Sequence, residues 1–142
     1  MTSLTAWHEY AEGVKNGKIT ACKRLKQAVK RYFSDLENPL CTFDPEVVER
    51  FIAFSRVCPH VKGAMRGSPI ELEPWQQFAF ACILGFKVKA TGRRKYTSAF
   101  IEVPRKNAKS TVAAILANWF LVMENGQQDI YTAAVSRDQA RI

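Results

Sequence analysis

A Lys-Ser pair stands where a short apolar segment turns into a long apolar stretch. Residues 98–103 have the length and composition of a buried strand, and Val112 to Met123 is an almost unbroken apolar run suited to a buried helix. The turn between them would direct free backbone N–H groups and the positive end of the helix toward one point. This order predicts an α/β fold that opens with a β-α-β unit of a mostly parallel sheet, preceded by a helical amino-terminal region.

Lys109 and Ser110 give this turn the chemistry of a phosphate-binding loop, or P-loop, because they add an ammonium charge and a hydroxyl for Mg²⁺. The general motif has Gly six positions before the Lys and again directly before it, whereas this chain has Val103 and Ala108. Glycine permits positive φ and a close approach to phosphate, so an Ala at position 108 is tolerated where its φ is negative. The alternative is a solvated basic turn whose cations are simply exposed.

The run from Val103 to Ser110 resembles the deviant Walker A motif of large terminase subunits, the ATP-driven DNA-packaging motors of tailed double-stranded DNA bacteriophages. That family usually has Gly in place of Ala108. The similarity covers nearly the whole chain, because other segments match the family in the same order. They are Tyr10, Val14, Gly17, Ile19 and Ala21–Arg24 near the amino terminus, Leu72–Phe78 and Gly85-Phe86 before the loop, and Ile130–Ala134 and Gln139-Ala140 after it.

The resemblance implies ATP and Mg²⁺ as cofactors and gives each residue of the loop a role. Lys109 would bridge the β- and γ-phosphates, and Ser110 would coordinate Mg²⁺. Thr111 and the backbone N–H groups from Asn107 and Ala108 onward would hold the α- and β-phosphates. These residues form the predicted nucleotide site.

Three further side chains are candidates for the same chemistry. By resemblance, Arg105 is linked to hydrolysis, where it would stabilise charge on the transferring phosphoryl group. Lys106 competes for the roles of Arg105, and the sequence does not separate the two. Gln76 carries a donor and an acceptor that match an edge of adenine; the resemblance favours this role over that of a solvent-facing side chain.

The length of 142 residues suits one domain with a modest core, whereas a complete motor ATPase needs a larger sheet and the family adds a nuclease domain. We therefore predict a truncated chain with a helical lead-in over 1–61, a linker over 62–71 and the first part of an ATPase domain over 72–142. The Walker B acid and the carboxylate that orients the attacking water are not identifiable. This fragment is expected to bind nucleotide weakly and to hydrolyse it negligibly.

Helical spacing and capping residues predict four helices before the loop. They are Leu4–Asn16, a helix following Thr20 as N-cap, a helix from Pro45 to about Val57 following Asp44 as N-cap, and a helix beginning at Pro74. Further on, Phe86–Ala90 and Tyr96–Val103 are expected to pair as a hairpin with a basic tip. The second helix carries five Lys and Arg residues, which form either a solvated surface or a grip on DNA phosphates.

The composition is that of a globular protein with a net charge of +8, which is compatible with a nucleic-acid partner. No apolar run is long enough to span a bilayer, and the amino terminus lacks the cationic start and apolar stretch of a signal peptide. Together with the resemblance to phage terminases, this implies action in the cytoplasm of the bacterial host, away from the membrane. Four widely spaced cysteines predict reduced thiols and no zinc site.

Taken with the resemblance, these features predict the amino-terminal ATPase segment of a viral DNA-packaging motor that translocates double-stranded DNA into a procapsid. The resemblance implies the small terminase subunit and the portal protein as partners, and a homo-oligomeric ring for the full-length protein. The alternative is a noncatalytic basic module that binds DNA or a partner and keeps the loop near Lys109 for structure only. Mg²⁺-ATP titration separates the two, because only the motor predicts an effect of nucleotide.

Overall fold

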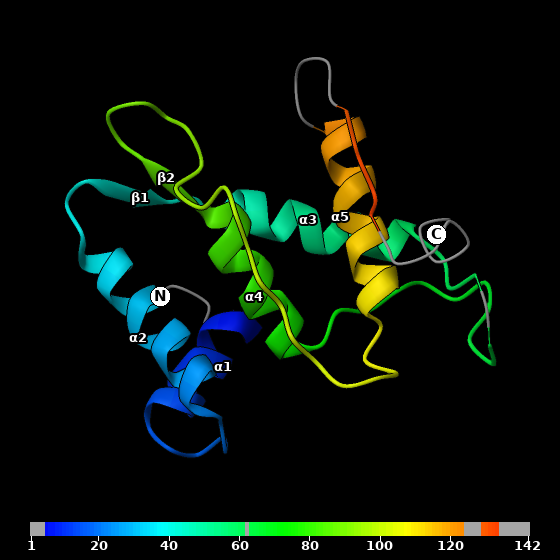
Figure 1. Cartoon of the computed structure of the whole chain (residues 1–142), viewed down its shortest axis with the longest axis horizontal. Coiled ribbons are helices and arrows are strands. Elements are labelled where there is room, and N and C mark those ends of the chain that lie inside the picture. The colour runs from blue at the N-terminus through cyan, green and yellow to red at the C-terminus, as the bar shows by residue number, and fades with distance from the viewer. Residues whose placement is uncertain (1–4, 62, 124–128, 134–142) are drawn as a thin grey trace. The chain divides into compact units, whose positions relative to one another are not determined.

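The computed structural model describes residues 5–61, 63–123 and 129–133 of the chain (Figure 1). It divides into two compact units, Met1–Ala99 and Phe100–Ile142. The first unit holds helices α1 to α4 and a small sheet, and the second holds helix α5. The predicted boundaries at residues 61 and 71 do not follow this division, and they stay a prediction about the whole protein. In the part of the chain that is described, no helix has both the length and the apolar character needed to cross a membrane.

The first two helices confirm the predicted helical amino-terminal region. Helix α1 spans Ala6–Lys15 and ends before Gly17, whose φ of 74° is a left-handed conformation that glycine adopts without strain. Helix α2 spans Lys23–Glu37. The predicted N-cap Thr20 is wrong, because Cys22 holds that position and makes no side-chain capping bond. Helix α2 therefore begins without the usual acceptor for its first N–H groups.

Helix α3 spans Pro45–Val57, as the sequence predicts. The Asp44 carboxylate accepts a hydrogen bond from the Val47 backbone N–H at 3.2 Å, and Pro45 occupies the first helical position. The same carboxylate pairs with the Lys87 ammonium at 2.7 Å, which lowers the pKa of Asp44. Asp44 therefore links the start of α3 to the segment that follows α4.

Helix α4 spans Pro74–Gly85 and is the centre of the first unit, because both α1 and α3 pack against it (Figure 1). Glu73 and Gln76 form a reciprocal capping box at its start, which explains why the chain becomes helical at Pro74. Phe78, Phe80 and Leu84 are buried along its length. The helix is apolar on most sides, as expected for a helix covered by two others.

The sheet differs from the predicted parallel one. Among the described residues it consists of β1 (Cys41–Phe43) and β2 (Phe86–Val88), which pair antiparallel with Cys41 opposite Val88 and Phe43 opposite Phe86. Residues 98–103 are not part of a strand, and neither are residues 130–133; residues 134–135 of the second predicted strand lie outside the described part. An apolar β-branched segment becomes a strand only where a neighbour exchanges backbone hydrogen bonds with it, and no parallel neighbour lies among the described residues.

The predicted pairing of 86–90 with 96–103 is wrong, because 86–88 meet residues 93–95 of the expected turn instead. Lys87 and Arg94 form an isolated antiparallel bridge, and the Lys95 N–H donates to the Phe86 carbonyl at 2.8 Å. The pairing does not continue into 96–103. The partner of β2 is instead β1, which precedes α3 and which the sequence pattern did not reveal.

A cluster of aromatic side chains around Tyr32 fills the core between α2, α4 and the sheet. The rings of Phe33, Phe43, Phe78 and Phe86 lie with their centroids 5.3–5.9 Å from that of Tyr32, mostly edge to face. Burial raises the pKa of Tyr32 to about 12. Gly85 lies against this cluster, since a Cβ at its position would stand 2.4 Å from Phe43 Cε2.

A buried carboxylate ties α2 to the segment after β2. Asp35 is 7% exposed, and its two oxygens accept hydrogen bonds from the Lys95 ammonium, at 2.5 Å, and from the Tyr96 hydroxyl. The hydrogen bond from Lys95 to Asp35 raises the pKa of Lys95, so that its charge is retained beside the carboxylate. Leu36 stands four residues after the buried Tyr32, a spacing that predicts a buried side chain, but it is 38% exposed.

Candidate nucleotide-binding site

The predicted P-loop is a tight turn that ends in helix α5, Lys109–Met123, in the second unit. Lys106 has a φ of 68° and Ala108 a φ of 53°, so both are in the left-handed region although neither is glycine. The condition under which an Ala at position 108 would be free of strain, a negative φ, is therefore not met. The turn takes the conformation for which the general motif has Gly before the Lys, and it does so at the cost of backbone strain.

The Lys109 side chain folds back over the turn. Its ammonium donates to the Val103 carbonyl at 2.7 Å and to the Pro104 carbonyl at 3.4 Å. The Asn107 amide nitrogen donates to the Pro104 and Arg105 carbonyls, at 3.2 Å each. These bonds hold the turn in a compact bend with the ammonium across its opening. The Lys109 ammonium is exposed, so an anion can reach it from solvent.

The start of α5 supplies hydrogen-bond donors to the same place. The first helical bond runs from the Val112 N–H to the Ala108 carbonyl at 2.9 Å, so Ala108 is the N-cap. The helix therefore provides no acceptor for the N–H groups of Lys109, Ser110 and Thr111. No acidic residue stands in its first turn. Free N–H groups, the positive end of the helix and one ammonium suit a bound phosphate chain, and the exposed Ser110 hydroxyl is a hard oxygen ligand that suits Mg²⁺.

The two candidates for a charge-stabilising role, Arg105 and Lys106, lie side by side in the turn and both are exposed. The Arg105 carbonyl is held by Asn107, whereas Lys106 has the left-handed backbone. Neither observation decides between their side chains. Both therefore keep the predicted role as a candidate.

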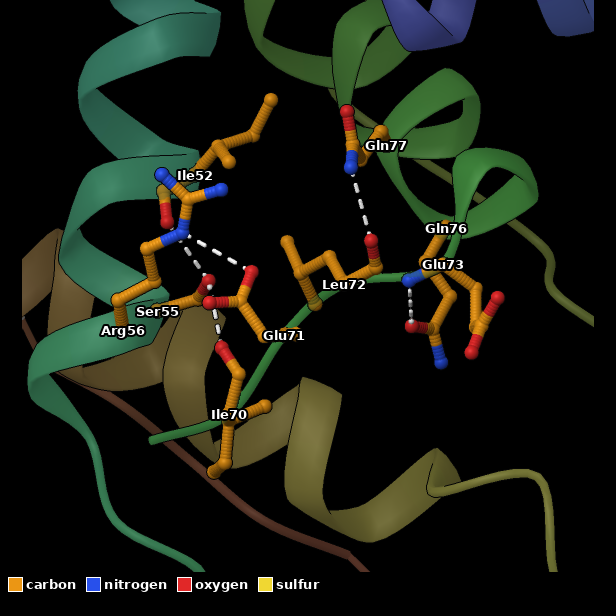
Figure 2. A network of polar contacts seen from close by, with 9 residues as sticks. All are labelled: Ile52, Ser55, Arg56, Ile70, Glu71, Leu72, Glu73, Gln76 and Gln77. Carbon is orange, nitrogen blue, oxygen red and sulfur yellow. Dashed lines mark hydrogen bonds and ion pairs between the residues drawn. The ribbon is translucent and has the colours of Figure 1, made fainter. Parts of the chain in front are cut away.

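Gln76 lies in the first unit, where the structure gives it a role that sequence reasoning missed. It is 6% exposed, and its side-chain oxygen accepts a hydrogen bond from the Glu73 backbone N–H at 2.9 Å (Figure 2). The neighbouring Gln77 donates to the Leu72 carbonyl at 2.8 Å. Gln at the third helical position after a Pro at the first fits one half of a capping box, so this role was partly within reach of the pattern. The predicted contact with adenine stays a prediction.

The segment before Gln76 is fastened to helix α3. The buried Ser55 hydroxyl lies 2.8 Å from the Ile52 carbonyl and 3.2 Å from the Ile70 carbonyl, and it donates to both (Figure 2). The Arg56 guanidinium pairs with Glu71 at 2.9 Å. Nearby, residues 59 and 69 form an antiparallel bridge that closes the predicted linker into a loop. The start of α4 is thus held from two sides.

Metal-binding side chains do not gather elsewhere in the described ranges. Those ranges hold no group of three or more His, Cys, Asp or Glu side chains that could bind a metal ion. The four cysteines are free thiols. The Ser110 hydroxyl, exposed at the start of α5, is the predicted Mg²⁺ ligand.

A mixed helical and β chain with a Lys-Ser pair at the start of a helix, after a bend closed by that Lys, is typical of the nucleotide-binding part of an NTPase. The comparison with protein families agrees, because residues 74–142 match the family of the terminase large subunit, ATPase domain. This match confirms the recognition drawn from the motifs and suggests the ATPase of a DNA-packaging motor. The family implies a P-loop-like fold, whereas the described residues form one antiparallel pair of strands and no parallel sheet. Neither the curated proteins nor the solved structures give a match.

Proposed function

We propose that residues 74–142 contribute the phosphate-binding part of an ATPase that uses Mg²⁺-ATP to drive double-stranded DNA into a procapsid. The observation that carries the proposal is the bend over 103–108, closed by the Lys109 ammonium at 2.7 Å from the Val103 carbonyl and followed by the open first turn of α5. The family match supports the same activity. Such a motor acts in the cytoplasm of an infected bacterium.

The roles of the residues follow from their places in the bend. Lys109 would exchange its bonds to the two carbonyls for bonds to the β- and γ-phosphates, because a phosphate oxygen is the stronger acceptor for an ammonium. Ser110 would hold Mg²⁺ through its hydroxyl, and Thr111 with the N–H groups from Asn107 onward would hold the inner phosphates. Bound Mg²⁺ would neutralise charge on the phosphates.

Arg105 or Lys106 would then stabilise negative charge on the phosphoryl group. Both are exposed and follow Pro104 in the bend. An arginine offers several donors in a fixed plane, whereas a lysine offers one compact charge, which favours Arg105 for a spread charge. In the complete motor, duplex DNA, the small terminase subunit, the portal protein and further copies in a ring would be the partners.

The experiment is a thermal unfolding measurement with and without Mg²⁺-ATP. A ligand that binds only the folded chain stabilises it by about 2.7 kcal/mol at a concentration 100 times its Kd, so a rise in Tm is expected. Lys109→Ala should abolish that rise, while Lys89→Ala, which removes an exposed lysine of the first unit, should keep it. The rise is compared within each variant, so that any change in the starting Tm cancels. Equal rises in all three proteins would refute the proposed site.

A second function, that of a noncatalytic basic binding module, is favoured by one observation, which is the group of five exposed Lys and Arg residues on the outer side of α2. It predicts no effect of nucleotide on any variant together with salt-sensitive DNA binding. The same titration, repeated with duplex DNA, therefore separates the two functions.

A further inference from the structure

The sequence around α2 has an unusual charge distribution. Between Glu12 and Asp35 the chain carries seven Lys and Arg residues and no acid. Five of the seven belong to α2, and they are Lys23, Arg24, Lys26, Lys30 and Arg31, all of them exposed. We call these five side chains the basic face of α2. No ion pair joins any of them to another described residue.

The five cations lie on one side of the helix. At roughly 3.6 residues per turn, they fall opposite Val29 and Tyr32, which are 2% exposed and face the core. The residues that share the outer side with them are Gln27 and Ser34, which are uncharged, and Glu37 at the last position of the helix. The nearest acid on the edge, Asp35, is buried and already paired with Lys95. Arg31 has a partner in the fold, because its guanidinium lies 5.5 Å from the centroid of the Tyr96 ring. The positive charge from Lys23 to Lys30 is not offset by an acid.

This arrangement is unfavourable for the helix itself. Lys23 and Arg24 stand in the first turn, where the positive end of the helix repels cations, and that turn has no acid. Lys26 and Lys30 are four residues apart, a spacing at which like charges repel. Helix α3 shows that a solvated surface does not require this pattern, because its exposed charges are balanced. They are Glu46, Glu49, Arg50 and Arg56.

We propose that the basic face of α2 binds the phosphate backbone of duplex DNA. The cations from Lys23 to Arg31 extend over about 12 Å of helix at a rise of 1.5 Å per residue. Duplex DNA carries one charge per about 1.7 Å of its axis when both strands are counted, so over that length it holds about seven phosphates, and the five cations can contact those on the side that faces the helix. The choice of duplex DNA over another dense polyanion rests on the proposed function. The contacts go to phosphates, so binding is independent of base sequence.

The test is fluorescence anisotropy of a labelled 20-base-pair duplex with the full chain, over a range of salt concentrations. Lys23→Gln with Lys30→Gln removes two cations of the basic face. Arg50→Gln with Arg66→Gln is the matched control, because it removes two exposed cations outside that face and leaves the same net charge of +6, starting from +8. The α2 double variant should bind about tenfold more weakly, with a salt slope lower by about 0.9 for each lost contact, while the control stays near the unchanged chain. Circular dichroism verifies that both variants keep their helices.

Two results would overturn the proposal. Equal losses in both double variants would mean that net charge, and not this face, attracts DNA. Displacement of the duplex by poly-L-glutamate at equal charge concentration would assign the face to acidic proteins. The nucleotide site is tested separately, because Lys109→Ala should leave DNA affinity unchanged and the α2 double variant should keep the Mg²⁺-ATP effect on Tm. A failure of one proposal is thereby distinguished from a failure of the other.

A second readout follows from the repulsion within α2. Replacing Lys23 by Glu should raise Tm, because an acid in the first turn interacts favourably with the positive helix end, and it should lower DNA affinity further than Lys23→Gln. A fall in both Tm and affinity would show that Lys23 serves the fold, against the proposal.

Discussion

The left-handed backbone at Ala108 leads to a prediction with a definite sign. An L-residue in this region is disfavoured by roughly 1–2 kcal/mol relative to glycine, which reaches it freely. Glycine also makes the unfolded chain more flexible, and this opposes the gain by about 0.4–1 kcal/mol. With φ at 53°, we expect Ala108→Gly to stabilise the bend by about 0.5–1 kcal/mol on balance.

The matched control is the same substitution a few residues later. Ala113 is exposed and lies inside α5, where the helical φ is negative. Ala113→Gly should therefore destabilise the chain by about 0.5–1 kcal/mol, the usual cost of glycine in a helix interior. Two Ala→Gly changes in one short segment are thus expected to shift stability in opposite directions.

Chemical unfolding in urea measures both variants, with the far-ultraviolet signal reporting the loss of helix. Repeating the measurement with Mg²⁺-ATP tests the site as well, because a relaxed bend at position 108 should bind nucleotide at least as tightly as the unchanged chain. A midpoint that falls for Ala108→Gly as much as for Ala113→Gly would refute the reasoning, since it would mean that no strain was present at position 108.

Two further predictions concern the carboxylates of the first unit. Asp44→Ala should cost about 1–2 kcal/mol through loss of the α3 cap and of the Lys87 ion pair. The hydrogen bond from Lys87 is the main cause that lowers the pKa of Asp44. The stability that the Asp44 carboxylate contributes is therefore present above its unfolded pKa and is lost as pH falls through its lower folded pKa. The urea midpoints of the unchanged chain and of Asp44→Ala should converge below about pH 4. Asp35→Asn should lower the free energy of unfolding by about 1.5–3 kcal/mol, because it removes the charged acceptor of Lys95. In a double-mutant cycle with Lys95→Gln, the two losses of stability should be coupled. Strictly additive losses would contradict the ion pair.

Local signals in the sequence predicted the helices well. Asp44-Pro45 at the start of α3 and Pro74 at the start of α4 were identified because capping and the fixed φ of proline act within a few residues. Thr20 failed as a cap for α2 because helix initiation there is set by packing of Val29 and Tyr32 rather than by the cap. The sequence therefore predicted a helix start correctly where the contacts that fix it join residues close together in the chain.

Contacts between residues far apart in the chain could not be predicted from the sequence. The pairing of β1 with β2 joins Cys41 to Val88, and the Asp35–Lys95 pair joins residues similarly far apart. The spacing of apolar residues shows which side of a helix or strand is buried, but it does not identify the distant residue that pairs with it. In the candidate site, the Lys-Ser pair and its place at a helix start were predicted, whereas the positive φ of Ala108 was not, because an alanine carries no signal for a conformation that it normally avoids.

The packing of α1 on α4 has a consequence for synthesis of the chain on the ribosome. Trp7, Ala11 and Val14 are buried, yet the helix that receives α1 begins only at Pro74. At about 5–20 residues per second, the ribosome needs several seconds after making α1 to deliver that helix. During this interval α1 can pack only on α2, and the part of its apolar stripe that contacts α4 stays open to non-native association until α4 has been made.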